Sequence, residues 1–344
     1  MPMTAPKMTD RNTTGLNRRE LLAAATVAGA ATALTSLGTP ALASEPPAGA
    51  QAPGFYRYKV GAYECTSIND GARTFPIPET FIRNAPKAEA VKAAEAAYMP
   101  AGMVTIPFNP QLINTGSKLI LIDTGNGVAN LEPSKGAVGR TLQNLAAAGV
   151  DPKKVDVVLL SHLHPDHING IRALDGSLAF PNAEIMVPSV DWAFWMSDEN
   201  ASKAQSNEMM KNYFGNVKKV FAGLETKVTK YDWGKEVVPG ITSISTPGHT
   251  PGHTSFWITS GNSKILIQSD VTNIPELFLL NPDWHVAYDT DGDLAQATRH
   301  KFYDMASAEK ATVVGFHFSF PCIGHVEKDG AKYRLIPSAW NPTI

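Results

Sequence analysis

Four side chains of the kind that bind metal ions fall within six residues of this chain, directly after an apolar run. They are His162, His164, Asp166 and His167. Residues i and i+2 of a strand lie on one face, so His162 and His164 at a strand end can point at one ion. Pro165 then turns the chain, so Asp166 and His167 lie beside that ion but point elsewhere. The spacing predicts two adjacent metal ions.

Most of the nine histidines of the chain lie in three groups that begin where a predicted strand ends. The later groups, together with an aspartate at another strand end, supply the other candidate ligands: His249 and His253, His317 and His325, and Asp270. Histidines and carboxylates without a thiolate among them suit zinc and similar divalent ions. Lone histidines such as His285 and His300 are predicted to be ordinary surface or core residues.

The three histidine groups and the strand-end Asp270, in this order along the chain, resemble the metal-binding motifs of the metallo-β-lactamase superfamily. The resemblance extends from about Phe55 to the C-terminus. Within the superfamily the chain resembles the methyl parathion hydrolase branch. The residues that carry this second resemblance are Asn114–Lys118 leading into Ile122–Gly125, the turn Phe180–Ala183, Phe194 with Trp195, and His317–Pro321 with Gly324 and His325. The resemblance implies an α/β fold, a single-domain, four-layer αββα sandwich.

The resemblance also implies two ligand sets. His162, His164 and His249 would hold the first ion, Asp166, His167 and His317 the second, and Asp270 would bridge them. Asp166 and Asp270 would act in catalysis with a metal-bridging hydroxide, since bound zinc lowers the pKa of its water to about 7. Zinc is the favoured metal, with manganese, cobalt or iron as alternatives.

Three residues near these ligands are expected to have supporting roles. His253 is predicted to lie behind the ligands or in turn packing, with His249 as the ligand. In the third group, His317 is likewise predicted to be the metal ligand in preference to His325. Asp123 is predicted to brace its loop through side-chain hydrogen bonds.

The first 43 residues read as a twin-arginine signal peptide. Arg18 and Arg19 precede a modestly apolar run, Leu21–Leu37, and a small-residue cleavage site at Ala41–Ala43. A transmembrane anchor is the alternative, but the run is short and rich in Ala, Thr and Gly. We therefore expect export to the periplasm or secretion, a flexible linker at 44–54 and a hydrolase domain at 55–344.

The net charge and the cysteine content limit the binding partners and the disulfide bonds that can be expected. Cleavage removes four of the 30 basic and two of the 32 acidic residues, which leaves a net charge of about −4. This gives no basic footprint for nucleic acid, and no other segment could span a membrane. Cys65 and Cys322 leave disulfide pairing open, and Cys322 is expected to be a small buried hydrophobe rather than a residue of the site.

Alternation and turn residues predict the elements of the sandwich. Strands are expected at Tyr56–Ser67, Leu119–Asp123, Val155–Ser161, Ala183–Pro188, Gly240–Ser245, Ser255–Thr259, Lys264–Gln268 and Ala311–Gly315. Helices are expected at Val138–Ala148, Asp191–Met196, Glu208–Phe221 and Leu294–Ala308. A hairpin is expected at Gly261-Asn262. Each histidine group then lies on a loop at a strand end.

The substrate pocket is harder to predict. The resemblance places Trp195, Tyr213 and Phe214 in aromatic walls, and Trp192 is a further candidate that also suits the core. The branch has a phenylalanine near position 134, where this chain has Ser134, which argues against strong phosphotriesterase activity. The long segment 271–293 is expected to be a lid or a homodimer contact.

Four functions are compatible with these features. The favoured one is an exported two-metal hydrolase of lactones, aryl esters or organophosphate triesters such as methyl parathion. A β-lactamase is disfavoured by Asp270 at the bridging position. An iron-dependent sulfur dioxygenase would leave His167 and His317 without a role, and a catalytically silent metal-binding relative would not need all seven ligands.

Overall fold

The computed structural model describes residues 48, 49 and 51–344, and the folded unit spans Ala52–Ile344. The predicted signal peptide at 1–43 lies outside the described residues, as does part of the predicted linker. In the described part of the chain, no helix combines the length and apolar character needed to cross a membrane.

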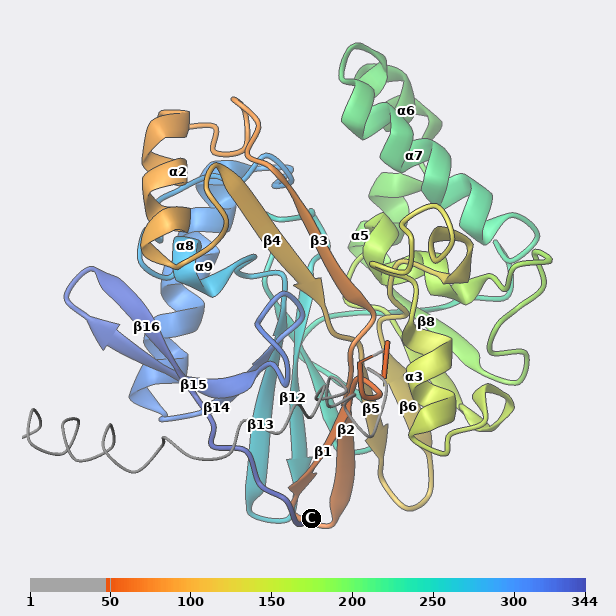
Figure 1. The fold of residues 1–344 in the computed structure, drawn as a ribbon. Helices are drawn as coiled ribbons and strands as arrows, with labels where there is room; N and C mark the ends of the chain where they lie inside the picture. The colour runs from red at the N-terminus through yellow and green to blue at the C-terminus, as the bar shows by residue number, and fades with distance from the viewer. Residues whose placement is uncertain (1–47, 50) are drawn as a thin grey trace, which may run out of the picture. The chain divides into compact units, whose positions relative to one another are not determined.

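Two seven-stranded sheets form the centre of the unit (Figure 1). The first contains, in order, β1 (Phe55–Val60), β2 (Tyr63–Ile68), β5 (Gln111–Asn114), β6 (Leu119–Ile122), β7 (Val157–Leu159), β8 (Glu184–Pro188) and β9 (Thr229–Tyr231). The second contains β10 (Glu236–Val238), β11 (Ile241–Ser245), β12 (Thr254–Ser260), β13 (Ser263–Ser269), β14 (Thr312–Gly315), β15 (Ile323–Asp329) and β16 (Lys332–Pro337). A separate hairpin consists of β3 (Gly71–Pro76) and β4 (Met103–Phe108).

The helices complete the layers. They are α2 (Lys87–Ala96), α3 (Thr141–Ala147), α4 (Pro165–Ile168), α5 (Ser189–Trp195), α6 (Asp198–Lys203), α7 (Glu208–Phe221), α8 (Pro275–Phe278) and α9 (Gly292–Ala308). Helices α3, α5 and α7 share a core cluster with the first sheet, and α9 packs against the second sheet at β15. The predicted αββα sandwich is confirmed.

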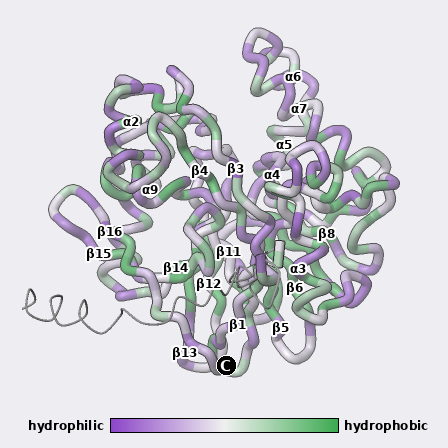
Figure 2. Tube along the Cα trace, viewed as in Figure 1, coloured by the Kyte–Doolittle hydropathy of each residue, from purple (hydrophilic) through white to green (hydrophobic). Residues whose placement is uncertain are grey.

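Side-chain alternation explains why the central strands are apolar throughout. In β7, Val157 and Leu159 join the core cluster that contains residues of both sheets, whereas Val158 joins the cluster shared with the helices. Both faces are therefore covered, as in parallel sheets generally. Figure 2 shows the opposite case, since the turn joining β15 and β16 is hydrophilic and lies at the periphery of the unit.

Several predicted elements match, and some differ. Helix α7 has the predicted bounds, and the hairpin at Gly261 joins β12 to β13. The single strand predicted at Tyr56–Ser67 is wrong, because Gly61, at φ 57°, turns the chain and separates β1 from β2. The prediction did not include the β3–β4 hairpin, β5, β9, β10, β15, β16, α2, α6 or α8.

The segment 271–293 is not an exposed apolar loop. It contains α8, and its side chains Phe278 and Leu279 are buried, the former in the cluster that includes the β3–β4 hairpin. Leu280 is exposed, at 44%. The expected apolar dimer surface is therefore mostly buried within the chain itself.

Candidate metal centre

All seven predicted ligands lie shortly after the end of a strand. His162 and His164 follow β7, and Asp166 and His167 lie in the first turn of α4, which begins at Pro165. The other three ligands, His249, Asp270 and His317, follow β11, β13 and β14 in that order. The carboxyl ends of strands from both sheets therefore supply the site.

The loops bring these side chains into two clusters. Potential ligand atoms lie within 4.8 Å of one another in each cluster. The first cluster is His162, His164 and His249, and the second is Asp166, His167, Asp270 and His317. Asp270 Oδ2 lies 3.3 Å from His249 Nε2 and 2.9 Å from His317 Nε2, so this carboxylate stands between the clusters.

The second ring nitrogen of most of these histidines is held by a neighbouring oxygen. Nδ1 of His162 lies 3.0 Å from Ser161 Oγ, and Nδ1 of His167 lies 2.9 Å from Asp123 Oδ2. Nδ1 of His249 lies 2.9 Å from Asp289 Oδ1, and Nδ1 of His317 lies 2.8 Å from the Pro107 carbonyl oxygen. Such contacts fix the orientation and tautomer of metal-binding imidazoles. In each of these four rings, Nε2 therefore remains available as the metal-binding atom of its cluster.

The residues present fit a pair of divalent ions. Within the described residues, Nε2 of His162, His164 and His167 is buried and has no hydrogen-bond partner. Buried polar atoms without partners are costly, and those of His162 and His167 are explained if cations lie beside them. His164 instead turns Nδ1 toward the first cluster, where it lies 2.9 Å from His249 Nε2. The mixed imidazole and carboxylate set suits zinc, or manganese, cobalt or iron.

Burial and charge act on the two clusters differently. Burial, together with neighbouring imidazoles, lowers the pKa of His162 and His164 well below the usual value. Burial would also lower the pKa of His167, but Asp270, Asp166 and Asp123 outweigh it and raise that pKa. His162 and His164 are therefore neutral imidazoles, whereas the carboxylates of the second cluster favour a positive charge on His167.

His253 lies outside both clusters of the described chain and supports Asp270 instead. The backbone N–H of Asp270 donates to its Nε2 at 3.0 Å, and Nδ1 lies 2.9 Å from the Thr246 carbonyl. Burial lowers the pKa of His253 to about 3, which keeps Nε2 unprotonated and able to accept. This placement agrees with the preference for His249 as the ligand.

The remaining histidines take no part in the clusters. His325 is exposed on β15, where Nδ1 lies 3.2 Å from the Ala311 carbonyl. His285 and His300 contact Gln296 and Asp283 near the surface.

Buried aspartates connect the ligand loops. Asp123 accepts hydrogen bonds from the backbone N–H and hydroxyl of Ser161, both at 2.8 Å, in addition to its contact with His167. Asp191 of α5 accepts from the backbone N–H groups of Leu163 and Gly252, both at 2.8 Å. The predicted bracing role of Asp123 agrees with these contacts, whereas Asp191 and Asp289 were missed because no sequence pattern marks them.

The clusters open into a cavity of about 790 Å³. His164, Asp166, His249, Asp270 and His317 line it on the side of the clusters. The β3–β4 hairpin lines it with Arg73, Thr74, Phe75, Ile106 and Phe108. This hairpin crosses between α2 and α5 in Figure 1 and gives the cavity its apolar wall.

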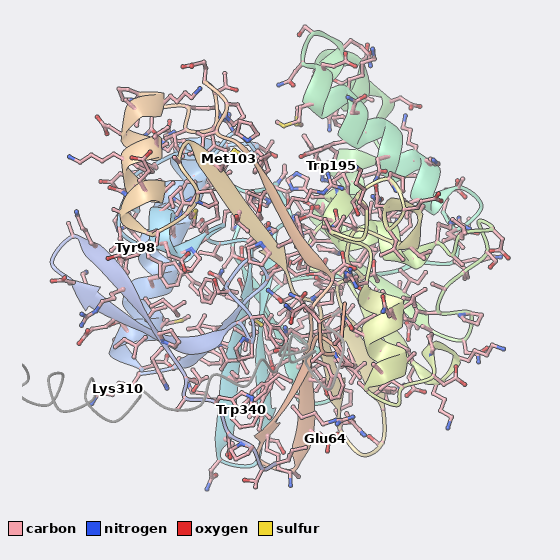
Figure 3. All side chains as sticks on the ribbon, viewed as in Figure 1. Glu64, Tyr98, Met103, Trp195, Lys310 and Trp340 are labelled. Atoms are coloured by element: carbon pink, nitrogen blue, oxygen red, sulfur yellow. The ribbon has the colours of Figure 1, made fainter. Side chains whose placement is uncertain are left out.

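The predicted aromatic walls are only partly present. Tyr213 lines the cavity, and its ring centroid lies 4.8 Å from that of His164. Trp195, Phe214 and Trp192 belong to the helix-side core and are not lining residues, which corrects the prediction. Trp195, labelled in Figure 3, is fully buried, and its ring centroid lies 4.8 Å from that of Phe214 on α7. Its indole N–H donates to Asp191 at 3.1 Å.

Two other expectations concern Ser134 and Cys322. Ser134 lines the cavity, but its hydroxyl contacts the Leu131 and Val138 carbonyls of its own loop. Cys65 and Cys322 are both buried free thiols. Cys322 Sγ lies 3.3 Å from Ser67 Oγ and is not among the lining residues, so it is not part of the site.

Comparison with known proteins decides the family. Residues 109–317 match the family model of the metallo-beta-lactamase superfamily. The chain belongs to this superfamily. The match covers the whole span from the start of β5 to His317, and the predicted metal-dependent hydrolase is confirmed at this level.

Known relatives of this superfamily member include lactonases. An N-acyl homoserine lactonase of Bacillus thuringiensis is 27% identical over an alignment of 202 residues that covers 54% of this chain and 72% of the relative. The solved structure of the hydrolase AbOPH has a TM-score of 0.76 and 31% identity, covering 85% of this chain and all of that chain. The dizinc quorum-quenching lactonase AidC, solved with the product N-hexanoyl-L-homoserine, has a TM-score of 0.75 and 28% identity, covering 84% and 98%.

Proposed function

We propose that this superfamily member is a two-metal hydrolase that opens lactones bearing an acyl chain. The observation that carries the proposal is the pair of ligand clusters that flank Asp270 and open into a cavity with an apolar wall. A lactone ring could lie at the clusters while its chain packs against Ile106 and Phe108. The similarity to two lactonases supports the same substrate class.

The protein residues have distinct roles in this proposal. His162, His164 and His249 would hold one ion, and Asp166, His167 and His317 the other, with Asp270 shared between them. When bound, the ions would supply a Lewis acid and a water acidic enough to ionise near neutral pH. Asp270, fixed by the N–H contact with His253, would keep the two ions adjacent, and the hairpin would exclude water from the apolar side.

Aryl esters and organophosphate triesters are secondary candidates. One activated water can attack carbonyl and phosphoryl centres alike, so the metal centre itself does not separate these substrates. The cavity wall would separate them, because Ser134 lines the cavity near the position where the resemblance implies a phenylalanine in the methyl parathion hydrolase branch. We therefore expect weaker turnover of aromatic phosphotriesters than of lactones.

A substrate panel tests the function. The zinc-loaded enzyme would be assayed with an N-acyl homoserine lactone, an alkyl lactone, an aryl ester, a dimethyl phosphorothioate triester and a chromogenic β-lactam. We expect kcat/KM to be highest for a lactone and to vanish on chelation. Turnover of the β-lactam alone would refute the proposal.

Export and assembly are further proposals. Arg18 and Arg19 support twin-arginine export, which would deliver a folded, metal-loaded enzyme to the periplasm. Replacing both with lysine should retain the protein in the cytoplasm, as cell fractionation would show, and normal export of that variant would refute this route. A homodimer would need a surface other than the apolar side chains of segment 271–293, which are mostly buried, and light scattering of the purified enzyme would test whether it forms.

A further inference from the structure

The wall of the cavity contains a largely buried side-chain amide. Asn273 lies three residues after Asp270, lines the cavity together with it, and is 6% exposed. Within residues 48–49 and 51–344, its Oδ1 is buried and has no hydrogen-bond partner. Because Oδ1 is enclosed, the amide nitrogen is the polar atom that Asn273 can offer to a molecule in the cavity.

The other asparagines around the cavity are engaged in the protein. Asn126 donates to Asp70 at 3.1 Å, and Asn130 donates to the Asn126 carbonyl at 2.6 Å. Asn169 accepts from Asn216 at 2.8 Å. These amides brace the loops that carry them. Among the residues that the structure describes, the Asn273 amide makes no hydrogen bond that would brace its loop, so its Nδ2 is available to a molecule bound in the cavity.

We propose that Asn273 determines specificity by donating a hydrogen bond from Nδ2 to a carbonyl oxygen that the substrate carries outside the ester being cleaved. This inference rests on the proposed lactone hydrolysis. The reacting carbonyl would lie at the ligand clusters, where the metal ions polarise it. An N-acyl lactone has a second carbonyl in its amide, and an alkyl lactone has none. Asn273 therefore selects acylamino lactones over alkyl lactones.

A pair of matched substrates tests the selection. Wild-type enzyme and Asn273→Leu would be compared on an N-hexanoyl homoserine lactone and on a γ-lactone with an alkyl chain of similar length. Loss of one neutral hydrogen bond should lower kcat/KM for the acylamino lactone by about threefold to tenfold. The value for the alkyl lactone should stay within about twofold, since that substrate lacks the acceptor.

Controls separate recognition from structural damage. Asn273→Ala provides a second variant if the leucine is too large, and metal content and melting temperature show whether each variant keeps its metal centre. Asn130→Leu is the matched cavity asparagine whose amide is already engaged, and any effect it has should be the same on both substrates.

Each outcome decides between the proposals. A selective loss on the acylamino lactone, with metal content unchanged, supports the role of Asn273. An equal loss on both lactones, or no loss on either, overturns it while leaving lactone hydrolysis standing. If wild-type enzyme cleaves neither lactone, the proposed function fails, and the role of Asn273 fails with it.

Discussion

Removal of the Asp289 carboxylate should weaken metal binding and destabilise the fold together. Asp289 Oδ1 lies 2.9 Å from His249 Nδ1, and Oδ2 lies 3.6 Å from Arg299 Nη2. Asp289 and Arg299 are 4% and 1% exposed, so this pair is buried. Arg299 also donates to the carbonyls of Val271, Pro282 and Trp284, which ties the segment 271–293 to α9.

Two magnitudes follow for Asp289→Ala. Loss of an oxygen that orients a metal-binding imidazole typically costs about 10- to 100-fold in metal affinity. Breaking a buried ion pair leaves the guanidinium uncompensated, which costs about 3–5 kcal/mol of unfolding free energy. Asp289→Asn should retain more of the metal affinity, because the amide oxygen can still accept from His249, but it should lose stability since the charge opposite Arg299 is gone.

Competition against a chromophoric chelator would measure zinc affinity, and urea denaturation of the metal-free protein would measure stability. Asp283→Ala is the control, because Asp283 pairs with His300 at the surface and should contribute less than about 1 kcal/mol. Unchanged zinc affinity in Asp289→Ala, with the fold intact, would refute the orienting role of this carboxylate.

Three further predictions concern the site. Asp270→Ala should lower zinc stoichiometry and reduce kcat by several orders of magnitude, and two bound ions with normal turnover would exclude Asp270 as the shared ligand. His249→Ala should abolish binding at the first cluster while His253→Ala is far milder, and the reverse order in metal analysis would exchange their roles. Trp195→Ala should cost about 3–5 kcal/mol of stability through core packing, and a selective rise in KM for aromatic substrates without destabilisation would place this indole in the pocket instead.

The sequence predicted the clusters because their ligands are marked locally. The spacing of His162, His164, Asp166 and His167 carries its own geometry, with a strand periodicity before Pro165 and a helical turn after it. The other ligands also follow strand ends, and the strand ends of one sandwich meet at the same edge. Their positions in the sequence are therefore enough to predict that they join the same metal centre.

The cavity could not be predicted in the same way, because it depends on contacts between distant segments. The β3–β4 hairpin lies more than 50 residues before the first ligand, and nothing in its sequence indicates that Ile106 and Phe108 face the site. Trp195 was assigned to the wall, but a large apolar side chain gains more from full burial, and the core beneath α7 provides it. Asp289 gave no signal, because its partners lie 40 residues before it and on α9.

Zinc titration of the metal-free enzyme tests the central claim most directly. Chelated protein would receive increasing zinc while the initial rate of N-acyl homoserine lactone hydrolysis and the amount of bound metal are followed together. The account predicts that activity is absent without metal and reaches its maximum at two bound ions per chain. Full activity in the metal-free protein, or a maximum at one ion with no further binding, would contradict a two-metal lactone hydrolase.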